Sequence, residues 1–163
     1  MLRAAGFRVF RRRVFESNVV FDTTAMTLRK SRTLLRVREA GSHSTLTFKG
    51  VPVAGKHKSR EELETEVVSA RTLTQILDRL GFQPAFRYEK YRTEYRAAGG
   101  SGTATLDETP IGVYLELEGS PRWIDRMAKK LGFAESDYIT LSYSTLYVRW
   151  CDAHRKTPAF MTF

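Results

Sequence analysis

Seven stretches of the chain alternate hydrophobic and polar residues, as half-buried β-strands do. Gly-rich turns separate some of them, at residues 40–42 and 98–102. This order predicts a largely antiparallel meander in one α+β domain over residues 1–150, followed by a C-terminal tail over 151–163. The expected strands are Arg8–Phe21, Leu34–Glu39, Ser44–Gly50, Ser59–Val68, Phe86–Arg96, Gly102–Asp107 and Ile111–Gly119.

A Gly-Phe pair follows a short apolar and basic segment three times, at Gly6-Phe7, Gly81-Phe82 and Gly132-Phe133. In each copy Gly stands where a helix ends in a left-handed cap, and Phe is expected to return to the core. Ser69 predicts the start of the helix that runs through Leu80, and Ser120-Pro121 the start of the helix that runs through Leu131.

Helical segments are also expected at both ends of the domain. Residues 142–150 predict a final amphipathic helix. The first Gly-Phe copy has no helix before it, so the chain is expected to start inside a helix whose earlier part is missing.

Charged residues gather on one side of five expected strands, because successive side chains of a strand point to opposite faces. These sets are Arg36 and Arg38; Lys49 with Thr45 and Thr47; Arg60, Glu62, Glu64 and Glu66; Tyr88, Lys90, Arg92 and Glu94; and Tyr114, Glu116 and Glu118. A solvated face would explain any one strand. Five strands together favour an antiparallel β-barrel whose charged side lines a tunnel and whose apolar side is covered by helices packed outside.

The mixture of charges on this face indicates a ligand. Arg bridges phosphate oxygens with its planar fork, Lys offers a compact charge, and carboxylates suit hard cations such as Mg²⁺ or Mn²⁺. The two sets together favour a triphosphate with a divalent metal. The net charge agrees, because 27 Lys and Arg exceed 18 Asp and Glu and leave +9, which favours polyanionic partners.

Composition argues against several other classes. No apolar run approaches the length of a membrane-spanning helix, and the start lacks a signal peptide's apolar stretch. We expect a soluble, cytoplasmic protein without a membrane partner, and a homodimer is open. His43, His57, His154 and the single cysteine, Cys151, lack metal-ligand or nucleophile spacing. Packing or capping roles are expected for Trp123, Trp150 and Ser142-Tyr143.

In order and with compatible spacing, the charged segments from about residue 2 to about residue 146 resemble the CYTH family. That family holds class IV adenylyl cyclases, thiamine triphosphatases and inorganic or organic triphosphatases. The segments that carry the resemblance are Phe21-Asp22-Thr23, residues 35–39, residues 46–50, residues 60–66, residues 86–92, residues 106–110, residues 115–119 and residues 141–143. The resemblance implies an eight-stranded antiparallel triphosphate tunnel.

The resemblance also implies roles for single residues. The implied triphosphate ligands are Arg36, Arg38, Lys49, Arg60, Lys90 and Arg92, and the implied ligands of Mg²⁺ or Mn²⁺ are Glu116, Glu118 and Asp107. Glu62, Glu64 and Glu66 are expected to support the basic residues through ion pairs. No general base is assigned, but a lysine with a lowered pKa could activate the nucleophile, and Lys49 and Lys90 are the candidates.

The sequence departs from the family pattern in one respect. The family's N-terminal strand carries Glu-x-Glu-x-Lys, and this motif occurs nowhere in the chain. We therefore expect half of the metal site to be absent, the chain to be truncated relative to the family, and the barrel to lack one strand and expose two edges.

Three functions fit these observations. The first is metal-dependent hydrolysis of an organic or inorganic triphosphate such as ATP, thiamine triphosphate or tripolyphosphate. The second is a class IV adenylyl cyclase that forms cyclic AMP and pyrophosphate from ATP, and the third is a non-catalytic binder of polyphosphate or RNA. We favour hydrolysis, because alternation reveals no adenine pocket. Nucleic acid is disfavoured, because inward Glu-x-Glu pairs would repel a bare phosphate chain.

Overall fold

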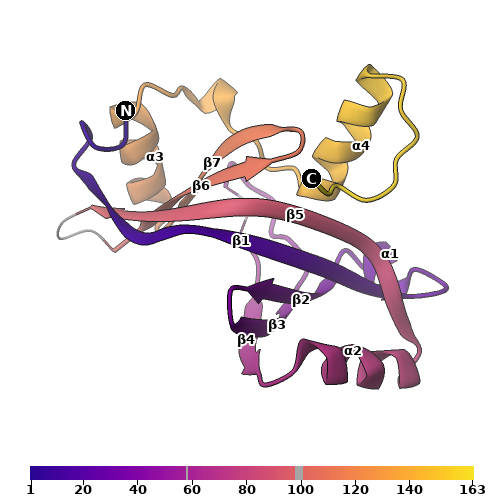
Figure 1. Cartoon of the computed structure of the whole chain (residues 1–163). Helices are drawn as coiled ribbons and strands as arrows, with labels where there is room; N and C mark the ends of the chain where they lie inside the picture. Colours follow the sequence, from indigo (N-terminus) through magenta and orange to yellow (C-terminus); the bar gives the residue numbers. More distant parts are fainter. Residues whose placement is uncertain (58, 98–100) are drawn as a thin grey trace.

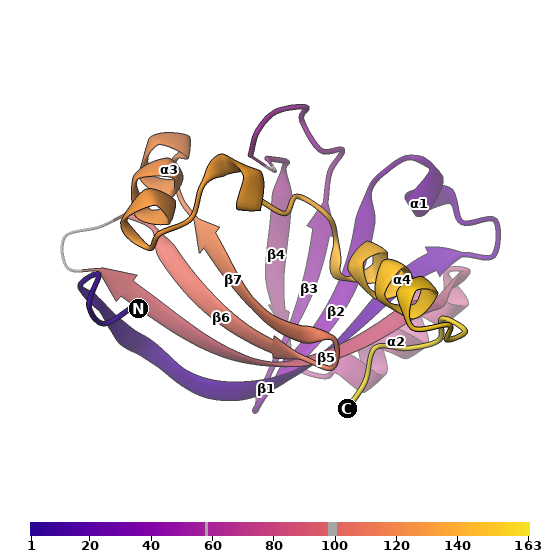
Figure 2. The ribbon, with the colours of Figure 1, turned by 90° about the horizontal axis from the view of Figure 1, so that it is seen from above.

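Seven antiparallel strands form one curved sheet in the computed structural model, which describes residues 1–57, 59–97 and 101–163 (Figures 1 and 2). The strand order is β4-β3-β2-β1-β5-β6-β7. The strands are β1 (Phe7–Thr23), β2 (Leu34–Ala40), β3 (His43–Lys49), β4 (Glu62–Val67), β5 (Phe82–Ala97), β6 (Thr103–Thr109) and β7 (Gly112–Glu118). The predicted α+β meander is confirmed, although part of the predicted 98–102 turn, residues 98–100, lies outside the described residues.

The long central strands β1 and β5 set the curvature of the sheet. They pair from Phe7 opposite Ala97 to Thr23 opposite Phe82, and three register shifts interrupt this pairing. Such irregularities bend a strand and increase its twist. Within the described residues the sheet curls without closing, with β4 and β7 as its edges, so the closed barrel and the eighth strand are not present there.

The predicted caps determine where the helices begin and end. Helix α2 (Ala70–Arg79) starts at Ser69, whose hydroxyl accepts from Thr72 N at 3.1 Å, and α3 (Pro121–Lys130) starts at Ser120. Gly6, Gly81 and Gly132 have φ of 83°, 86° and 88°, which confirms the left-handed turn at all three Gly-Phe pairs. Gly81 and Gly132 follow α2 and α3, but residues 2–6 form turns, so the helix expected at the start of the chain is not present among the described residues. The predicted last helix is confirmed as α4 (Tyr143–Ala153).

Two short helices were not predicted. Helix α1 (Thr27–Lys30) is organised by Asp22, whose carboxylate accepts from the amides of Thr23, Leu28 and Arg29 at 2.8–2.9 Å. The 3₁₀ turn η1 (Glu135–Asp137) follows α3. Strand β4 is shorter than predicted and begins at Glu62, which leaves Arg60 in the preceding loop.

Two apolar clusters hold the outer helices against the sheet. Helix α2 packs Leu77 against Phe21 and Val37, and α3 packs Trp123 and Met127 against Ala104. These strand residues alternate with the charged positions, so α2 and α3 lie on the apolar face, as predicted. No helix of the described residues has the length and apolar character needed to cross a membrane.

Helix α4 departs from the prediction that helices pack outside. The ring centroid of its Tyr143 lies 5.8 Å from that of Tyr88, and the ring centroid of its Tyr147 lies 6.0 Å from that of Phe86, on the face opposite the apolar clusters. The following segment then runs along β5, where Met161 is buried and exchanges backbone hydrogen bonds of 3.0 Å and 2.9 Å with Arg87 and Glu89. Strand β6 pairs with β5 only from Tyr91 onward, so the C-terminal residues occupy the edge that β6 leaves free.

Candidate functional site

A fully buried carboxylate organises one half of the charged face. Asp107 on β6 accepts from Lys90 Nζ at 2.7 Å, from Arg92 Nε at 2.7 Å and from Tyr143 Oη at 2.7 Å. Arg92 also contacts Glu116 on β7. Four elements, β5, β6, β7 and α4, therefore meet at this point.

The pKa values of this group follow from the competition between burial and the two cations. Burial raises the pKa of Asp107, but the hydrogen bond from Arg92 and the charge of Lys90 outweigh it and bring the pKa to about 2. The same competition lowers the pKa of Glu116. Burial and the two carboxylates raise the pKa of Tyr143, which therefore remains a hydrogen-bond donor.

The other half of the charged face lies on β2, β3 and β4. Arg36 donates to Tyr88 Oη at 3.3 Å and to Thr47 Oγ1 at 3.0 Å, and its Nη2 lies 3.7 Å from Glu64. Lys49 pairs with Glu62 at 2.7 Å. The pKa of Lys49 is lowered, chiefly by burial and also by the nearby cations of Arg36 and Arg60, although Glu62 opposes this.

Two residues of β1 connect the halves, and the sequence analysis did not identify them. Asn18 Oδ1 accepts from Arg38 Nε at 3.0 Å. Glu16 Oε2 lies 3.4 Å from Arg38 Nε and 3.6 Å from Lys90 Nζ. Register shifts on either side of Arg11 break the alternation of faces along β1. Taking every second residue from Arg11, which lies opposite Glu94, therefore assigns Glu16 and Asn18 to the wrong face. Counting from Phe21 backward would have placed them on the charged face.

The structure therefore brings together most of the predicted site residues. Interactions link Arg36, Arg38, Lys49, Lys90, Arg92, Asp107, Glu116, Glu62 and Glu64 on one face of the sheet. Two predicted residues stand apart, because Glu118 is exposed at the end of β7 and Glu66 lies 3.9 Å from His43. Arg60 precedes β4 but is close enough to Glu62 and Arg36 for their charges to act on its pKa, which burial lowers. Tyr143, for which packing was predicted, reaches the charged cluster, whereas Ser142 caps α4 as predicted.

The carboxylates expected to bind Mg²⁺ or Mn²⁺ do not form a metal site in this arrangement. Both oxygens of Asp107 already accept hydrogen bonds from cations, and Glu116 is paired with Arg92. Within residues 1–57, 59–97 and 101–163, no three His, Cys, Asp or Glu side chains are grouped as metal ligands. The donor set thus does not fit a bound divalent ion, and metal dependence remains a prediction from the resemblance.

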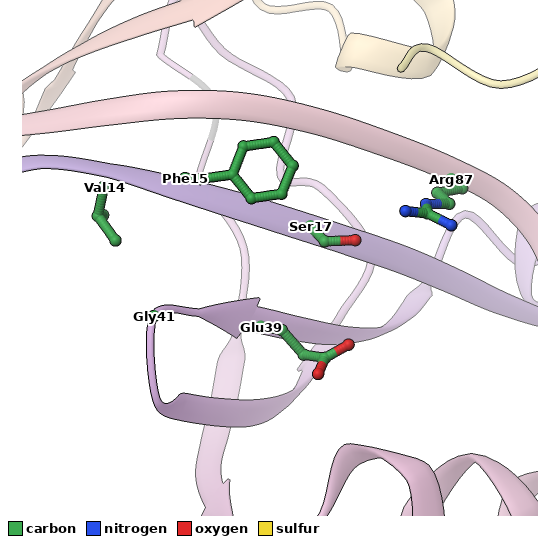
Figure 3. Close-up of a pocket in the computed structure, with 6 residues that line it drawn as sticks. All are labelled: Val14, Phe15, Ser17, Glu39, Gly41 and Arg87. Carbon is green, nitrogen blue, oxygen red and sulfur yellow. The ribbon is translucent and has the colours of Figure 1, made fainter. Parts of the chain in front are cut away.

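A hollow of about 390 Å³ lies on the opposite face of β1 and β2 (Figure 3). Its walls include Phe15, Ser17, Glu39 and Arg87, which alternate with the charged-face positions of the same strands. Glu39 would repel phosphate, and the clustered cations point away from this hollow. We therefore place the site on the charged face.

A sequence model of the CYTH domain matches residues 6–143. The chain belongs to the CYTH domain family. This CYTH chain is 28% identical over 131 residues to a Methanocaldococcus jannaschii protein named "Putative adenylate cyclase". The aligned residues cover 80% of this chain and 73% of that protein.

Solved structures share the fold. A Pyrococcus horikoshii protein is 25% identical with a TM-score of 0.72, covering 91% of this chain and 90% of that one. A Hippeastrum protein, described as a "Putative adenylyl cyclase" that "reveals a dominant" triphosphatase activity, is 17% identical with a TM-score of 0.62, covering 92% and 86%. The curved antiparallel sheet is thus a CYTH-type fold.

Proposed function

We propose that this CYTH chain binds a triphosphate-bearing small molecule on its charged face and hydrolyses the triphosphate. The observation that carries the proposal is the convergence of Arg36, Arg38, Lys49, Lys90 and Arg92 on one face. Two buried N–H donors there, Arg36 Nε and Asn18 Nδ2, find no acceptor among the described residues. Buried donors usually have partners, so unsatisfied donors beside clustered cations favour an anionic ligand.

The chemistry of hydrolysis assigns complementary tasks to these side chains. The guanidinium groups stabilise charge on the phosphate oxygens while water attacks the terminal phosphorus. The bond from that phosphorus to the bridging oxygen breaks, the diphosphate part of the substrate leaves, and the attacked group becomes inorganic phosphate. Of the two candidate bases, Lys49 is better suited to take the proton of the water, because its pKa is lowered. Lys90 is enclosed by Asp107 and Glu16, and holding the triphosphate is the role we assign to it.

A second candidate function is adenylyl cyclisation, which the name of the 28% identical relative favours. In that reaction the same cations hold ATP while the ribose 3′-hydroxyl attacks the α-phosphorus and pyrophosphate leaves. The two functions share their ligands, so the products separate them.

The test incubates the protein with ATP, thiamine triphosphate or tripolyphosphate, each with Mg²⁺, Mn²⁺ or EDTA, and identifies the products. Phosphate release supports hydrolysis, and cyclic AMP with pyrophosphate supports the cyclase. Absence of both products, together with no calorimetric binding of tripolyphosphate, would refute the proposal.

A matched pair of variants locates the site. Arg92→Gln should weaken tripolyphosphate binding about tenfold or more, since it removes a charge-assisted interaction. Arg87→Gln changes the same strand on the opposite face and should bind like the wild type. Equal losses in the two variants would place binding elsewhere.

A further inference from the structure

Strand β1 supplies the buried part of the charged face with an acid, Glu16, and an amide, Asn18. Glu16 and Asn18 are 4% and 0% exposed, so both side chains are held inside the molecule. Asn18 lies opposite Arg38 on β2 and Tyr88 on β5, and Glu16 lies opposite Lys90. The pair therefore sits at the centre of the seven-stranded order, between the two halves of the cluster.

The contacts of this pair converge on two of the proposed ligands. Arg38 Nε faces Asn18 Oδ1 at 3.0 Å and Glu16 Oε2 at 3.4 Å, while Glu16 Oε2 also lies 3.6 Å from Lys90 Nζ. Because Arg38 Nε is a donor, it requires the oxygen of Asn18 on its side and leaves Nδ2 turned away. One hydrogen bond to Asn18 and one ion pair with Glu16, whose Oε2 accepts no hydrogen bond from the described residues, thus act on the same guanidinium.

A buried carboxylate is a costly neighbour for an anion site. Glu16 would repel a triphosphate, and its burial costs free energy unless its charge is compensated. Holding Arg38 and Lys90 in place accounts for both features. Preorganised cations lose less side-chain freedom on binding, and a fixed Arg fork keeps the geometry that phosphate oxygens need.

We propose that Glu16, together with Asn18, is a positioning residue that orients Arg38 and Lys90 toward the triphosphate. The inference rests on the proposed function, because it assigns the pair a role in that same site. Glu16 does not need to touch the ligand in this role. Removing the charge of Glu16 should therefore weaken triphosphate binding, whereas electrostatic repulsion alone predicts that the same change strengthens it.

The decisive variant is Glu16→Gln, which removes a negative charge beside an anion site. Coulomb attraction alone would strengthen tripolyphosphate binding, whereas loss of positioning should weaken it about tenfold, as measured by calorimetry at low salt. Glu39→Gln is the matched control, because it removes the same charge from an exposed position on the other face of β2. It should bind no more weakly than the wild type. Unchanged or tighter binding by Glu16→Gln would overturn the inference.

Asn18 provides an independent arm through a double-mutant cycle. Asn18→Leu should weaken binding in the wild-type background but have little further effect when Arg38 is already Gln, because both changes remove the same oriented guanidinium. Additive losses would show that Asn18 does not act through Arg38. Ser17→Ala, on the opposite face of the same strand, should leave binding unchanged.

Folding is followed by thermal melting for every variant. If Glu16→Gln does not fold, Glu16→Asp keeps the charge but draws the carboxylate back from Arg38. It should weaken binding, and wild-type affinity in Glu16→Asp would count against positioning. Failure of the wild type to bind tripolyphosphate would refute the proposed function itself, a result distinct from each of these outcomes.

Discussion

Asp107 shows how one residue organises the chemistry of its neighbours. Its carboxylate accepts from Lys90, Arg92 and Tyr143 and is fully buried. Removing one partner of a buried ionic group leaves the others uncompensated, which is more costly than losing an exposed pair. Asp107 therefore contributes to stability as well as to the direction of two proposed ligands.

Acid should reveal this contribution. The pKa of Asp107 is about 2 in the fold, below its ordinary 3.8, so the ionised form stabilises the fold at higher pH. That stabilisation, on the order of 2 kcal/mol, is present above about pH 4 and is lost as the pH falls through about 2. Denaturant unfolding across this range should show the loss in the wild type. Asp107→Asn should lack this component and be less stable at neutral pH by about 3–5 kcal/mol.

The exposed Asp152 provides the control for that measurement. Asp152→Asn should keep the wild-type dependence on pH. If Asp107→Asn still lost the full amount of stability at low pH, that loss would belong to another carboxylate.

Lys49 gives a prediction for the rate rather than for stability. A base acts only when deprotonated, so hydrolysis should accelerate with rising pH and level off below the ordinary lysine pKa of 10.5, because burial lowers the pKa of Lys49. Lys49→Arg keeps the positive charge but should abolish the increase of the rate with pH. It should also lower kcat by at least about a hundredfold. An identical pH profile in Lys49→Arg would exclude Lys49 as the base.

Helix α3 is held to the sheet by close contact between an indole and two glycines. A Cβ added at Gly102 would lie 2.5 Å from the Trp123 ring, and one at Gly119 would lie 2.9 Å from it. Overpacking of this kind typically costs about 1–3 kcal/mol. We expect Gly102→Ala to lower the free energy of unfolding in urea by that amount. Gly55→Ala is the control, since its Cβ would meet nothing closer than 3.8 Å, and equal midpoints for the two variants would contradict this account.

The elements themselves could be predicted well from the sequence. Alternation located all seven strands, and the Ser caps and Gly-Phe pairs located α2 and α3, because these signals depend on local backbone geometry. Local signals could not reveal α1, which depends on Asp22 reaching Leu28 and Arg29, or the shifts in β1 that only pairing with β5 creates.

The site was predictable to a similar degree. Alternation placed Arg36 and Lys90 on one face, and the resemblance added Asp107, but neither could show which acid holds which base. The contact between Tyr143 and Asp107 spans 36 residues and depends on α4 lying on the charged face, which no pattern in the chain specifies.

At the scale of the whole molecule, ion pairs connect the two edges of the open sheet. Lys56, in the loop between β3 and β4, lies 3.0 Å from Asp125 on α3 and 2.6 Å from Glu135 in η1. Helix α3 contacts β7, the other edge strand. Hydrogen bonding to Lys56 lowers the pKa of Asp125, so the link is complete above its ordinary pKa and weakens as the pH falls below it.

We expect Lys56→Ala to loosen both edges while leaving the centre of the sheet unchanged. Amide hydrogen exchange should become about two- to fivefold faster in β4 and β7, because exposed ion pairs contribute little individually and edge strands open locally. Exchange in β1 and β5 should not change. Lys129→Ala in α3 is the control, because no ion pair to Lys129 is found in the described part of the chain. Acceleration confined to the loop would mean that each edge is held by its own packing, and that this bridge plays no part in the curvature that brings the charged strands together.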